Sequence, residues 1–503
     1  MPAADPNEET LRTLIARWAR ESPSHTYLED ARSARTISYA ALDAAIDAWQ
    51  ETFDDLGLAR GSSVIVAERD PLGFAVAFLA AISSGMTAIP INPDLPDGEP
   101  SRTAGLIGGP VLVVAEHDWD DRDWAVSNVD PATGGPIGVV ARPGGFVGGA
   151  QGGLRPREGR AVLFTSGSTG TPKGTSLGEK QLLFVARQVA ANNQLTAEDR
   201  GFNSLPLFHV NAEVVGLLST LIAGATLILD ERFHRTGFWE LLDEREITWL
   251  NAVPAVLAVL TREGIPAVPG RLRFIRSASA PLPDAVRAAL ADTPLVVSWG
   301  MTEGASQIAA TTPGDDSHPR SVGRPLGSEI EVRSPEGEAL EAGETGTLWI
   351  RGPGIVREYL FGRASERFDA GGWLDTGDLG FVDVDGYVTL VGRLDDVINR
   401  GGEKVYPAEV EDVLLGDPRV LEAVVVARHD DVLGSVPVAY IVPVADLADT
   451  REQLVSDLVA RCEMALARFK RPVQISIATE LPRAAAGKVQ RSKVRQLADQ
   501  DAS

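Results

Sequence analysis

The feature that most restricts the fold is an alternation of helix-type and strand-type apolar segments. Apolar residues recur at helical spacing over 37–56, and a short apolar run follows at 64–67. The same order returns at 73–82 and 88–91. Alternation of this kind predicts an α/β fold with a mostly parallel sheet.

A chain of 503 residues is longer than one hydrophobic core can serve, so we expect more than one compact unit. The βα pattern resumes at 161–164. Between about 323 and 390, short strand-like runs alternate with Gly, Pro and Asp turns, which predicts a small antiparallel β unit. A short mixed α/β pattern then follows. We therefore predict a large N-terminal domain, 1–392, and a small α+β C-terminal domain, 393–503.

Residues 134–154 interrupt the βα pattern and are rich in glycine. Glycine is common in loops because it tolerates backbone conformations that other residues avoid. The stretch therefore predicts a flexible surface connection.

The chain is acidic, with 70 Asp and Glu against 47 Lys and Arg and a net charge of -23. Such a surface repels nucleic-acid phosphates and anionic lipids, so we expect neither nucleic acid nor membrane as a partner. The single cysteine, Cys462, excludes an internal disulfide, and six histidines with one thiol disfavour a structural zinc site. The N-terminus lacks a leader pattern, and the most apolar run, 214–229, is too short to span a bilayer. We expect a cytoplasmic protein.

The most informative segment is 163–174, Leu-Phe-Thr-Ser-Gly-Ser-Thr-Gly-Thr-Pro-Lys-Gly, which follows an apolar strand. Glycines let successive backbone N–H groups converge on an anion, and the hydroxyls and lysine add donors, so the loop predicts a polyphosphate site. It lacks the Gly-Lys-[Ser/Thr] ending of the Walker loop. A flexible linker is the alternative, and the ordered Pro-Lys-Gly ending argues against it.

Together with six further motifs in order, this loop resembles the adenylate-forming superfamily of acyl-CoA synthetases, luciferases and peptide-synthetase adenylation domains. The resemblance covers nearly the whole chain. It implies that ATP adenylates a carboxylate with release of pyrophosphate, that the acyl group passes to a thiol, and that the cofactors are ATP, Mg²⁺ and CoA. The further motifs are Pro-Leu-Phe-His at 206–209, Ser-Ala-Pro-Leu-Pro at 279–283, Trp-Gly-Met-Thr-Glu at 299–303, Trp-Leu-Asp-Thr-Gly-Asp at 373–378, Gly-Arg-Leu-Asp-Asp at 392–396 and Gly-Lys at 487–488.

The resemblance implies an ATP site. It assigns the loop to the β- and γ-phosphates, Glu303 and Thr165 to Mg²⁺, Thr302 to the α-phosphate, Trp299 to adenine and Asp378 to the ribose. The implied ATP-binding set is Thr165, Ser166, Gly167, Ser168, Thr169, Gly170, Lys173, Ser279, Ala280, Trp299, Gly300, Met301, Thr302, Asp378, Arg393, Lys404 and Lys488.

The resemblance also implies a catalytic lysine and a moving domain. Lys488 matches the lysine that bridges the carboxylate and the α-phosphate, and a charge on a flexible stem suits that task. The small C-terminal domain would be mobile about a hinge near Asp395, and Arg400, Gly401 and Gly402 would then line the pantetheine path of CoA. The implied catalytic set is Lys488, Thr302, Glu303, His209 and Arg393.

Stretches at 272–277 and 397–404 are most similar to the oxalyl-CoA synthetase-like branch of acyl-CoA ligases. In that branch, histidines at two pocket positions are thought to hold the second carboxylate of oxalate. This chain has Asn211 and Ser306 there, which removes an electrostatic reason to prefer a dianion. Arg276 is either a substrate cation or a buried partner of a helix end. The implied acid pocket is His209, Val210, Asn211, Asn251, Ser277, Gly300 and Ser306.

Three functions stay open at this point. The first is an acid–CoA ligase, favoured because the lysine and the pantetheine path are both present. The second is a CoA-independent adenylating enzyme, such as an ATP- and nitrite-dependent diazotase acting on an aromatic amine, which the small-anion pocket would suit. The third is a non-catalytic ATP-binding or carrier-docking protein, against which the intact Lys488 and Glu303 argue.

Overall fold

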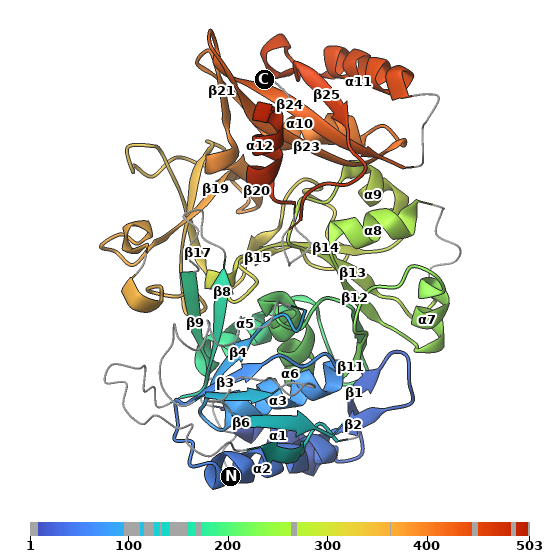
Figure 1. The fold of residues 1–503 in the computed structure, drawn as a ribbon, viewed down its shortest axis with the longest axis vertical. Coiled ribbons are helices and arrows are strands. Elements are labelled where there is room, and N and C mark those ends of the chain that lie inside the picture. Colours follow the sequence, from blue (N-terminus) through green and yellow to red (C-terminus); the bar gives the residue numbers. More distant parts are fainter. Residues whose placement is uncertain are drawn as a thin grey trace.

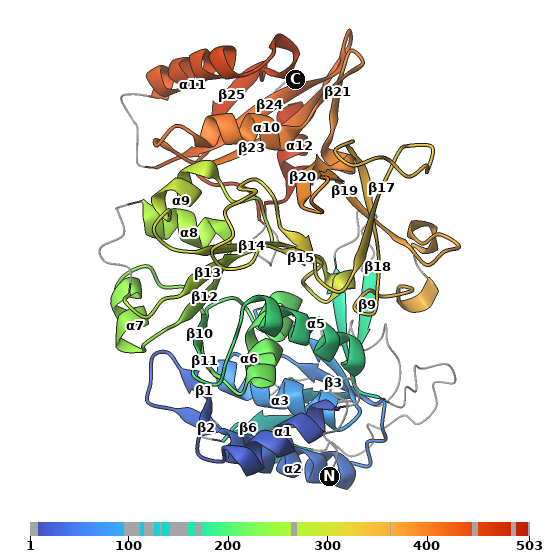
Figure 2. The same cartoon turned by 180° about the vertical axis from the view of Figure 1, so that it is seen from behind.

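The computed structural model confirms the predicted α/β class. Figures 1 and 2 show an elongated molecule, with α1 (Leu11–Glu21) and α2 (Tyr39–Asp55) near one end and the C-terminal elements at the other. The described residues form two large sheets, a small antiparallel sheet and a C-terminal sheet. The structure describes residues 9–94, 111–114, 125–130, 133–140, 158–165, 173–262, 269–362, 364–444, 451–483 and 489–500.

The nine-stranded sheet carries many of the predicted site residues. In order across the sheet its strands are β16 (Arg324–Pro325), β15 (Ala309–Ala310), β14 (Leu295–Trp299), β13 (Phe274–Ser277), β12 (Trp249–Ala252), β10 (Arg200–Asn203), β11 (Thr226–Leu229), β1 (Thr26–Asp30) and β2 (Thr36–Ser38). The central strands from β14 to β1 pair in parallel. Parallel strands place their carboxyl ends at one edge, so the segments that follow β10, β12, β13 and β14 meet there.

The seven-stranded sheet forms the second α/β layer. Its strands are, in order, β7 (Pro136–Val140), β6 (Ala125–Val129), β5 (Val111–Val114), β3 (Ser63–Val66), β4 (Thr87–Pro90), β8 (Arg160–Thr165) and β9 (Lys173–Gly178). The helix α3 (Pro71–Ser83) contacts β1 of the first sheet and β3 and β4 of the second. It is apolar all round and buried over nearly its whole length, as expected for a helix between two layers.

Local sequence signals fix where several helices begin. Thr10 forms a capping box at α1, and the side chains of Ser38 and Asp70 accept a backbone N–H at the starts of α2 and α3. Further helices among the described residues of this part of the chain are α5 (Glu179–Asn192), the π-helix η1 (Asn211–Leu218), α6 (Ser219–Ala223), α7 (Phe238–Glu244), α8 (Pro254–Thr261) and α9 (Asp284–Ala289).

The predicted small antiparallel unit is confirmed. Strands β17 (Glu329–Arg333), β18 (Gly346–Arg351), β19 (Leu374–Val382) and β20 (Val388–Arg393) pair as an antiparallel sheet. The short 3₁₀ segments η3 (Leu360–Gly362) and η4 (Ser365–Arg367) lie between β18 and β19.

The C-terminal sheet has its own hydrophobic clusters. The predicted boundary at 392–393 falls within the last residues of β20, because Arg393 still pairs with Asp378 of β19. The 3₁₀ segment η5 (Leu394–Asp396) follows and precedes the C-terminal sheet, which shares no strand with the small antiparallel sheet. The boundary and the hinge at Asp395 stay predictions. The C-terminal elements are β21 (Ile398–Arg400), β22 (Glu403–Val405), α10 (Pro407–Leu415), β23 (Val420–Asp430), β24 (Gly434–Pro443), α11 (Arg451–Ala465), the 3₁₀ segment η6 (Arg468–Lys470), β25 (Gln474–Ile477) and α12 (Arg491–Gln500).

The prediction of a loose glycine-rich connection is wrong for its first part. Residues 136–140 form the edge strand β7, which pairs antiparallel with β6. Gly134 has a φ of +70° and is buried, and its carbonyl accepts a hydrogen bond of 2.9 Å from Trp49 Nε1. A Cβ there would lie 2.6 Å from a Val76 methyl group, so the packing requires glycine. Most of the stretch, 141–154, lies outside the described residues.

None of the described helices is both long and apolar enough to cross a bilayer. The apolar run at 214–229 folds into η1, α6 and β11 instead. Cys462 lies buried on α11, where burial raises the pKa of its thiol to about 11. Such a thiol stays protonated at neutral pH and is a poor nucleophile, which agrees with a packing role.

Candidate functional site

A buried aromatic–acid pair joins the end of β14 to the small antiparallel sheet. The indole N–H of Trp299 donates to Asp378 Oδ2 at 2.8 Å, and Asp378 Oδ1 lies 3.1 Å from Arg393 Nη1. Asp378 and Arg393 are cross-strand partners of β19 and β20. The structure thus brings together three residues of the predicted ATP site, although Trp299 and Asp378 are 79 positions apart in the sequence.

Glu303 lies on the 3₁₀ turn η2 (Thr302–Gly304) that follows β14, and its side chain is buried. Its Oε1 accepts a 2.5 Å hydrogen bond from the Tyr359 hydroxyl and lies 3.5 Å from Arg367 Nη1. Burial and the nearby carboxylate raise the pKa of Tyr359, so its hydroxyl stays a donor. No described residue hydrogen-bonds to Glu303 Oε2, which leaves that oxygen as a possible cation ligand.

Tyr359 and Arg367 were not predicted from the sequence. Arg367 donates two hydrogen bonds here, from Nη1 to the Tyr359 hydroxyl at 2.6 Å and from Nε to the backbone carbonyl of Asp375 at 2.9 Å. The ammonium of Lys173 lies 5.6 Å from the centre of the Tyr359 ring. No motif marks these residues, because their role depends on a loop between β18 and β19 that folds back on the turn after β14.

The backbone around the turn after β14 is tightly packed and strained. Ala305 and Ser306 in this turn have φ values of +49° and +82°, and Ser279, which follows β13, has a φ of +78°. Residues other than glycine rarely adopt these conformations. A Cβ on Gly300 would lie 1.7 Å from the carbonyl oxygen of Ser306. Strain of this kind is often held at functional sites.

Gly300→Ala is expected to lower the midpoint of thermal unfolding, because the added methyl must push the backbone of 306–307 aside. Overpacking of this kind typically costs about 1–3 kcal/mol, and here the obstacle is main chain. Gly270→Ala is the matched control, since nothing lies within 4 Å of its added Cβ. Equal midpoints for the two variants would contradict the packing argument.

Three polar side chains form a row across the carboxyl ends of β10, β12 and β13. Asn203, Asn251 and Arg276 are register partners on these parallel strands. Asn251 Nδ2 donates to Asn203 Oδ1 at 3.0 Å and to Asn211 Oδ1, at the start of η1, at 2.9 Å. Arg276 Nη1 donates to Asn251 Oδ1 at 3.1 Å, and Nη2 donates to Gln307 Oε1 at 3.1 Å.

Of the two roles that the sequence left open for Arg276, the structure shows a contact of the helix-end kind, because Nη1 lies 3.4 Å from the side chain of Asn211, the first residue of η1. The hydrogen bonds of its guanidinium go to side-chain amide oxygens. Asn203 and Gln307 were missed, although the rule that ligands meet the carboxyl ends of parallel strands would have pointed to Asn203. Gln307 carries no such signal.

The other predicted acid-pocket residues flank this row. His209 packs its ring 4.5 Å from that of Phe208, and Val210 is the buried residue that precedes η1. Ser277 follows Arg276 on β13 and is buried, and Ser306 precedes Gln307. Hydrogen bonds join Asn211 and Asn251 to this row, and Ser277 and Ser306 are chain neighbours of Arg276 and Gln307. That all of these residues line one acid pocket stays a prediction.

The predicted CoA residues lie on a hairpin of the C-terminal sheet. Gly401 and Gly402, with φ values of +60° and +94°, form the two-residue turn between β21 and β22, where positive φ at both positions suits glycine. Arg400 Nη1 donates 2.9 Å to the carbonyl of Phe469, and Lys404 is exposed. Among the described residues, no hydrogen bond or ion pair joins these residues to Trp299 or Glu303.

Several predicted residues lie outside the described residues. They are Ser166, Gly167, Ser168, Thr169 and Gly170 of the loop, and Gly487 and Lys488. The ends of the loop are described: Thr165 closes β8, Lys173 opens β9, and the two are register partners. Among the rest of the ATP-binding set, Ala280 and Ser279 are exposed, whereas Met301 and Thr302 are half-buried.

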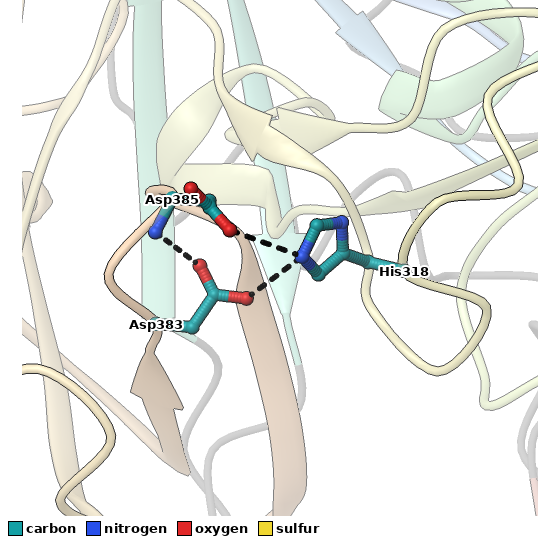
Figure 3. A group of neighbouring side chains, drawn as sticks. All are labelled: His318, Asp383 and Asp385. Carbon is teal, nitrogen blue, oxygen red and sulfur yellow. Dashed lines mark hydrogen bonds and ion pairs between the residues drawn. The ribbon is translucent and has the colours of Figure 1, made fainter.

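A separate group of His318, Asp383 and Asp385 lies between the loop before β16 and the turn from β19 to β20 (Figure 3). His318 Nε2 lies 3.4 Å from Asp383 Oδ2 and 3.7 Å from Asp385 Oδ2, and its ring stacks on Tyr387 at 3.8 Å. The backbone N–H of Asp385 and that of Tyr387 both bind Asp383 Oδ1. These contacts explain why the three residues lie together, because they hold the loop before β16 against the turn from β19 to β20.

Comparison with known proteins places this geometry in context. The AMP-binding enzyme family matches residues 15–360, and the AMP-binding enzyme C-terminal domain matches residues 409–488. Sulfoacetate–CoA ligase of Cupriavidus necator is 32% identical over 97% of this chain and 97% of its own length. Oxalate–CoA ligase of Arabidopsis thaliana is 32% identical over 97% of this chain and 99% of its own length.

The o-succinylbenzoate CoA synthetase of Bacillus subtilis shares the fold in two solved structures. In complex with its acyl-adenylate intermediate it has a TM-score of 0.81 at 27% identity and covers 96% of this chain and 97% of its own. In complex with ATP and a magnesium ion it has a TM-score of 0.80 at 28% identity and covers 95% of this chain and 98% of its own.

Proposed function

Because this chain belongs to the AMP-binding enzyme family, we propose that it is an ATP- and Mg²⁺-dependent acid–CoA ligase, which adenylates a carboxylate, releases pyrophosphate and passes the acyl group to CoA. The observation that carries the proposal is that two relatives aligned over 97% of the chain are acid–CoA ligases. The two relatives are named for different acids, so they do not identify the acid that this chain would use.

The described residues support an ATP site at the end of β14. Asp378 is fixed by Trp299 and Arg393, so its carboxylate is positioned to accept the ribose hydroxyls without reorganisation. Glu303, whose Oε2 has no hydrogen bond from a described residue, would hold Mg²⁺ together with Thr165. A bound Mg²⁺ would neutralise phosphate charge as two anions approach each other.

The C-terminal residues give less direct support for the second half of the proposed reaction, the transfer of the acyl group to CoA. Asp395 is an exposed residue of η5, between two sheets that share no strand, which is where a pivot can absorb a change in φ and ψ. The hairpin with Gly401 and Gly402 presents backbone without side chains, which suits close approach by a slender thioester arm. We infer that this hairpin receives pantetheine when the C-terminal domain turns.

The enzyme is expected to consume ATP only with Mg²⁺ and a suitable acid, and to release AMP and pyrophosphate. Pyrophosphate release should be measured across a panel of acids and nitrite, with and without CoA. Acyl-CoA as the second product supports the ligase, whereas ADP and phosphate would exclude adenylation. Pyrophosphate release with nitrite and an aromatic amine, independent of CoA, would favour the second candidate, a diazotase.

That second candidate is favoured by one observation. Arg276 is a fully buried cation whose hydrogen-bond partners are all neutral, so a small anion such as nitrite could sit near it. The panel separates the two candidates because only the ligase needs both a carboxylate and CoA.

A further inference from the structure

Arg276 is a cation without a described counter-charge. Its side chain is 0% exposed, and no described carboxylate forms an ion pair with it. Burial lowers the pKa of Arg276 to about 9, which leaves the guanidinium charged at neutral pH. Buried charges are normally paired, because removing an ion from water is costly.

The neighbouring groups do not neutralise this charge. The Nη atoms donate to the amide oxygens of Asn251 at 3.1 Å, Gln307 at 3.1 Å and Asn211 at 3.4 Å, all of which are uncharged. Glu213, two residues along η1 from Asn211, is fully buried, but burial raises its pKa well above its usual range, which favours the neutral acid. The polar row therefore carries a net positive charge.

Several donors beside Arg276 lack acceptors among the described residues. They are Arg276 Nε, Gln307 Nε2 and Ser277 Oγ, and each belongs to a side chain that is at most 1% exposed. A buried donor without an acceptor costs about 1–3 kcal/mol, so such groups are rare unless something else binds them. An incoming oxyanion would supply acceptors and a counter-charge together.

The position of the row fits a ligand. It lies at the carboxyl ends of β10, β12 and β13, the edge at which ligands bind in open parallel sheets. The partner Asn211 is the first residue of a π-helix, and π-helical turns are frequent at functional sites. Gly300 and Ser306 connect this edge to the turn that carries Glu303.

We propose that Arg276, with the amides of Asn211, Asn251 and Gln307, anchors a second anionic group on the acid, so that the substrate is a small acid with two anionic groups. The inference rests on the proposed function, since it deepens the acid site of the same enzyme. The acids in the names of the relatives, sulfoacetate, oxalate and o-succinylbenzoate, each have two acidic groups. Arg276 would here supply the positive charge for the second anionic group, because this chain has Asn211 and Ser306 where the oxalyl-CoA synthetase-like branch has histidines.

Arg276→Met in the full-length enzyme tests the assignment. The quantity is the ratio of kcat/KM for dianionic acids (oxalate, malonate, succinate, sulfoacetate) to kcat/KM for monoanionic acids of similar size (acetate, propionate, butyrate). The ratio is expected to exceed ten in the unaltered enzyme and to fall about 100-fold in Arg276→Met, mostly through KM, as expected when one partner of a buried charge pair is lost. Arg271→Met is the control, because that side chain is 63% exposed, and it should leave the ratio unchanged.

Asn211→Asp tests the same idea without emptying the core. The side chains of Asn and Asp have nearly the same shape, and the new carboxylate would lie 3.4 Å from Arg276 Nη1. It would pair with the guanidinium and so compete with the second anionic group of the substrate. The ratio should then fall at least tenfold while circular dichroism and thermal unfolding show a folded protein. This variant decides the question if Arg276→Met does not fold.

The outcomes separate the inference from the function beneath it. Two results would overturn the anchoring role of Arg276 and leave the proposed ligase function intact. One is a preference for monoanionic acids in the formation of AMP and acyl-CoA. The other is a kcat/KM ratio that neither Arg276→Met nor Asn211→Asp changes. A panel on which no acid releases pyrophosphate would overturn the proposed function and the anchor together.

Discussion

Lys488→Ala is expected to slow formation of the adenylate from acid and ATP by about 10²–10³-fold, with ATP binding nearly intact. The reason is differential binding, because the lysine would neutralise charge that the carboxylate and the α-phosphate share only near the transition state. Loss of one such contact costs roughly 3–4 kcal/mol on the scale of a single oxyanion donor. The measurement is acid-dependent exchange of pyrophosphate into ATP, with ATP affinity measured separately by titration.

Transfer from a chemically prepared acyl-adenylate to CoA should fall much less in the same variant, because Lys488 would not face the acyl group in that half-reaction. Lys493→Ala is the matched control, since Lys493 is an exposed lysine of α12 five residues away. If both half-reactions slow by the same factor, Lys488 supports the C-terminal domain and is not the adenylating lysine.

Glu303→Gln is expected to lower Mg²⁺-dependent formation of AMP by about 10²-fold or more and to raise the Mg²⁺ concentration for half-maximal rate at least tenfold. The amide can still accept the hydrogen bond from Tyr359, but it removes the charge that would bind the cation. A carboxylate oxygen is a far better ligand for Mg²⁺ than an amide. The measurement is the initial rate of pyrophosphate release against Mg²⁺ concentration at fixed ATP.

Glu366→Gln provides the control, because Glu366 is an exposed carboxylate beside Arg367. Its Mg²⁺ dependence should match that of the unaltered enzyme. If Glu303→Gln shifts only the midpoint of thermal unfolding and not the Mg²⁺ dependence, then Glu303 serves to hold Tyr359 and Arg367, and the metal is bound elsewhere.

The fold was largely predictable from local patterns. The strand predicted at 64–67 is β3 (Ser63–Val66), and the helix predicted at 73–82 is α3, which begins two residues earlier and ends one residue later. Boundaries were set by caps such as Asp70, which hydrophobic periodicity does not register. The prediction of a loose connection failed over 136–140 because this segment, Pro-Ile-Gly-Val-Val, has three β-branched residues, which favour a strand, and a proline, which an edge strand tolerates.

The site was predictable only in part. The motifs pointed to Trp299, Asp378, Arg393 and Glu303, and the structure joins the first three by direct contacts. Tyr359 was missed because nothing in its neighbourhood marks it until its hydroxyl reaches Glu303, 56 positions away. Substitutions at Asn211 and Ser306 argued against a dianion, and the burial of Arg276 now argues for one.

The sequence by itself determined the α/β class, the small antiparallel unit and the residue types of the site, because these follow from periodicity and from motifs within a few residues of each other. Only the tertiary structure decided that Asn203, Asn251 and Arg276 form one row. Their contact depends on strand order and register, which are set by packing between residues 25 to 48 positions apart. Whether a charge has a partner is likewise a property of three-dimensional burial, which no local pattern encodes.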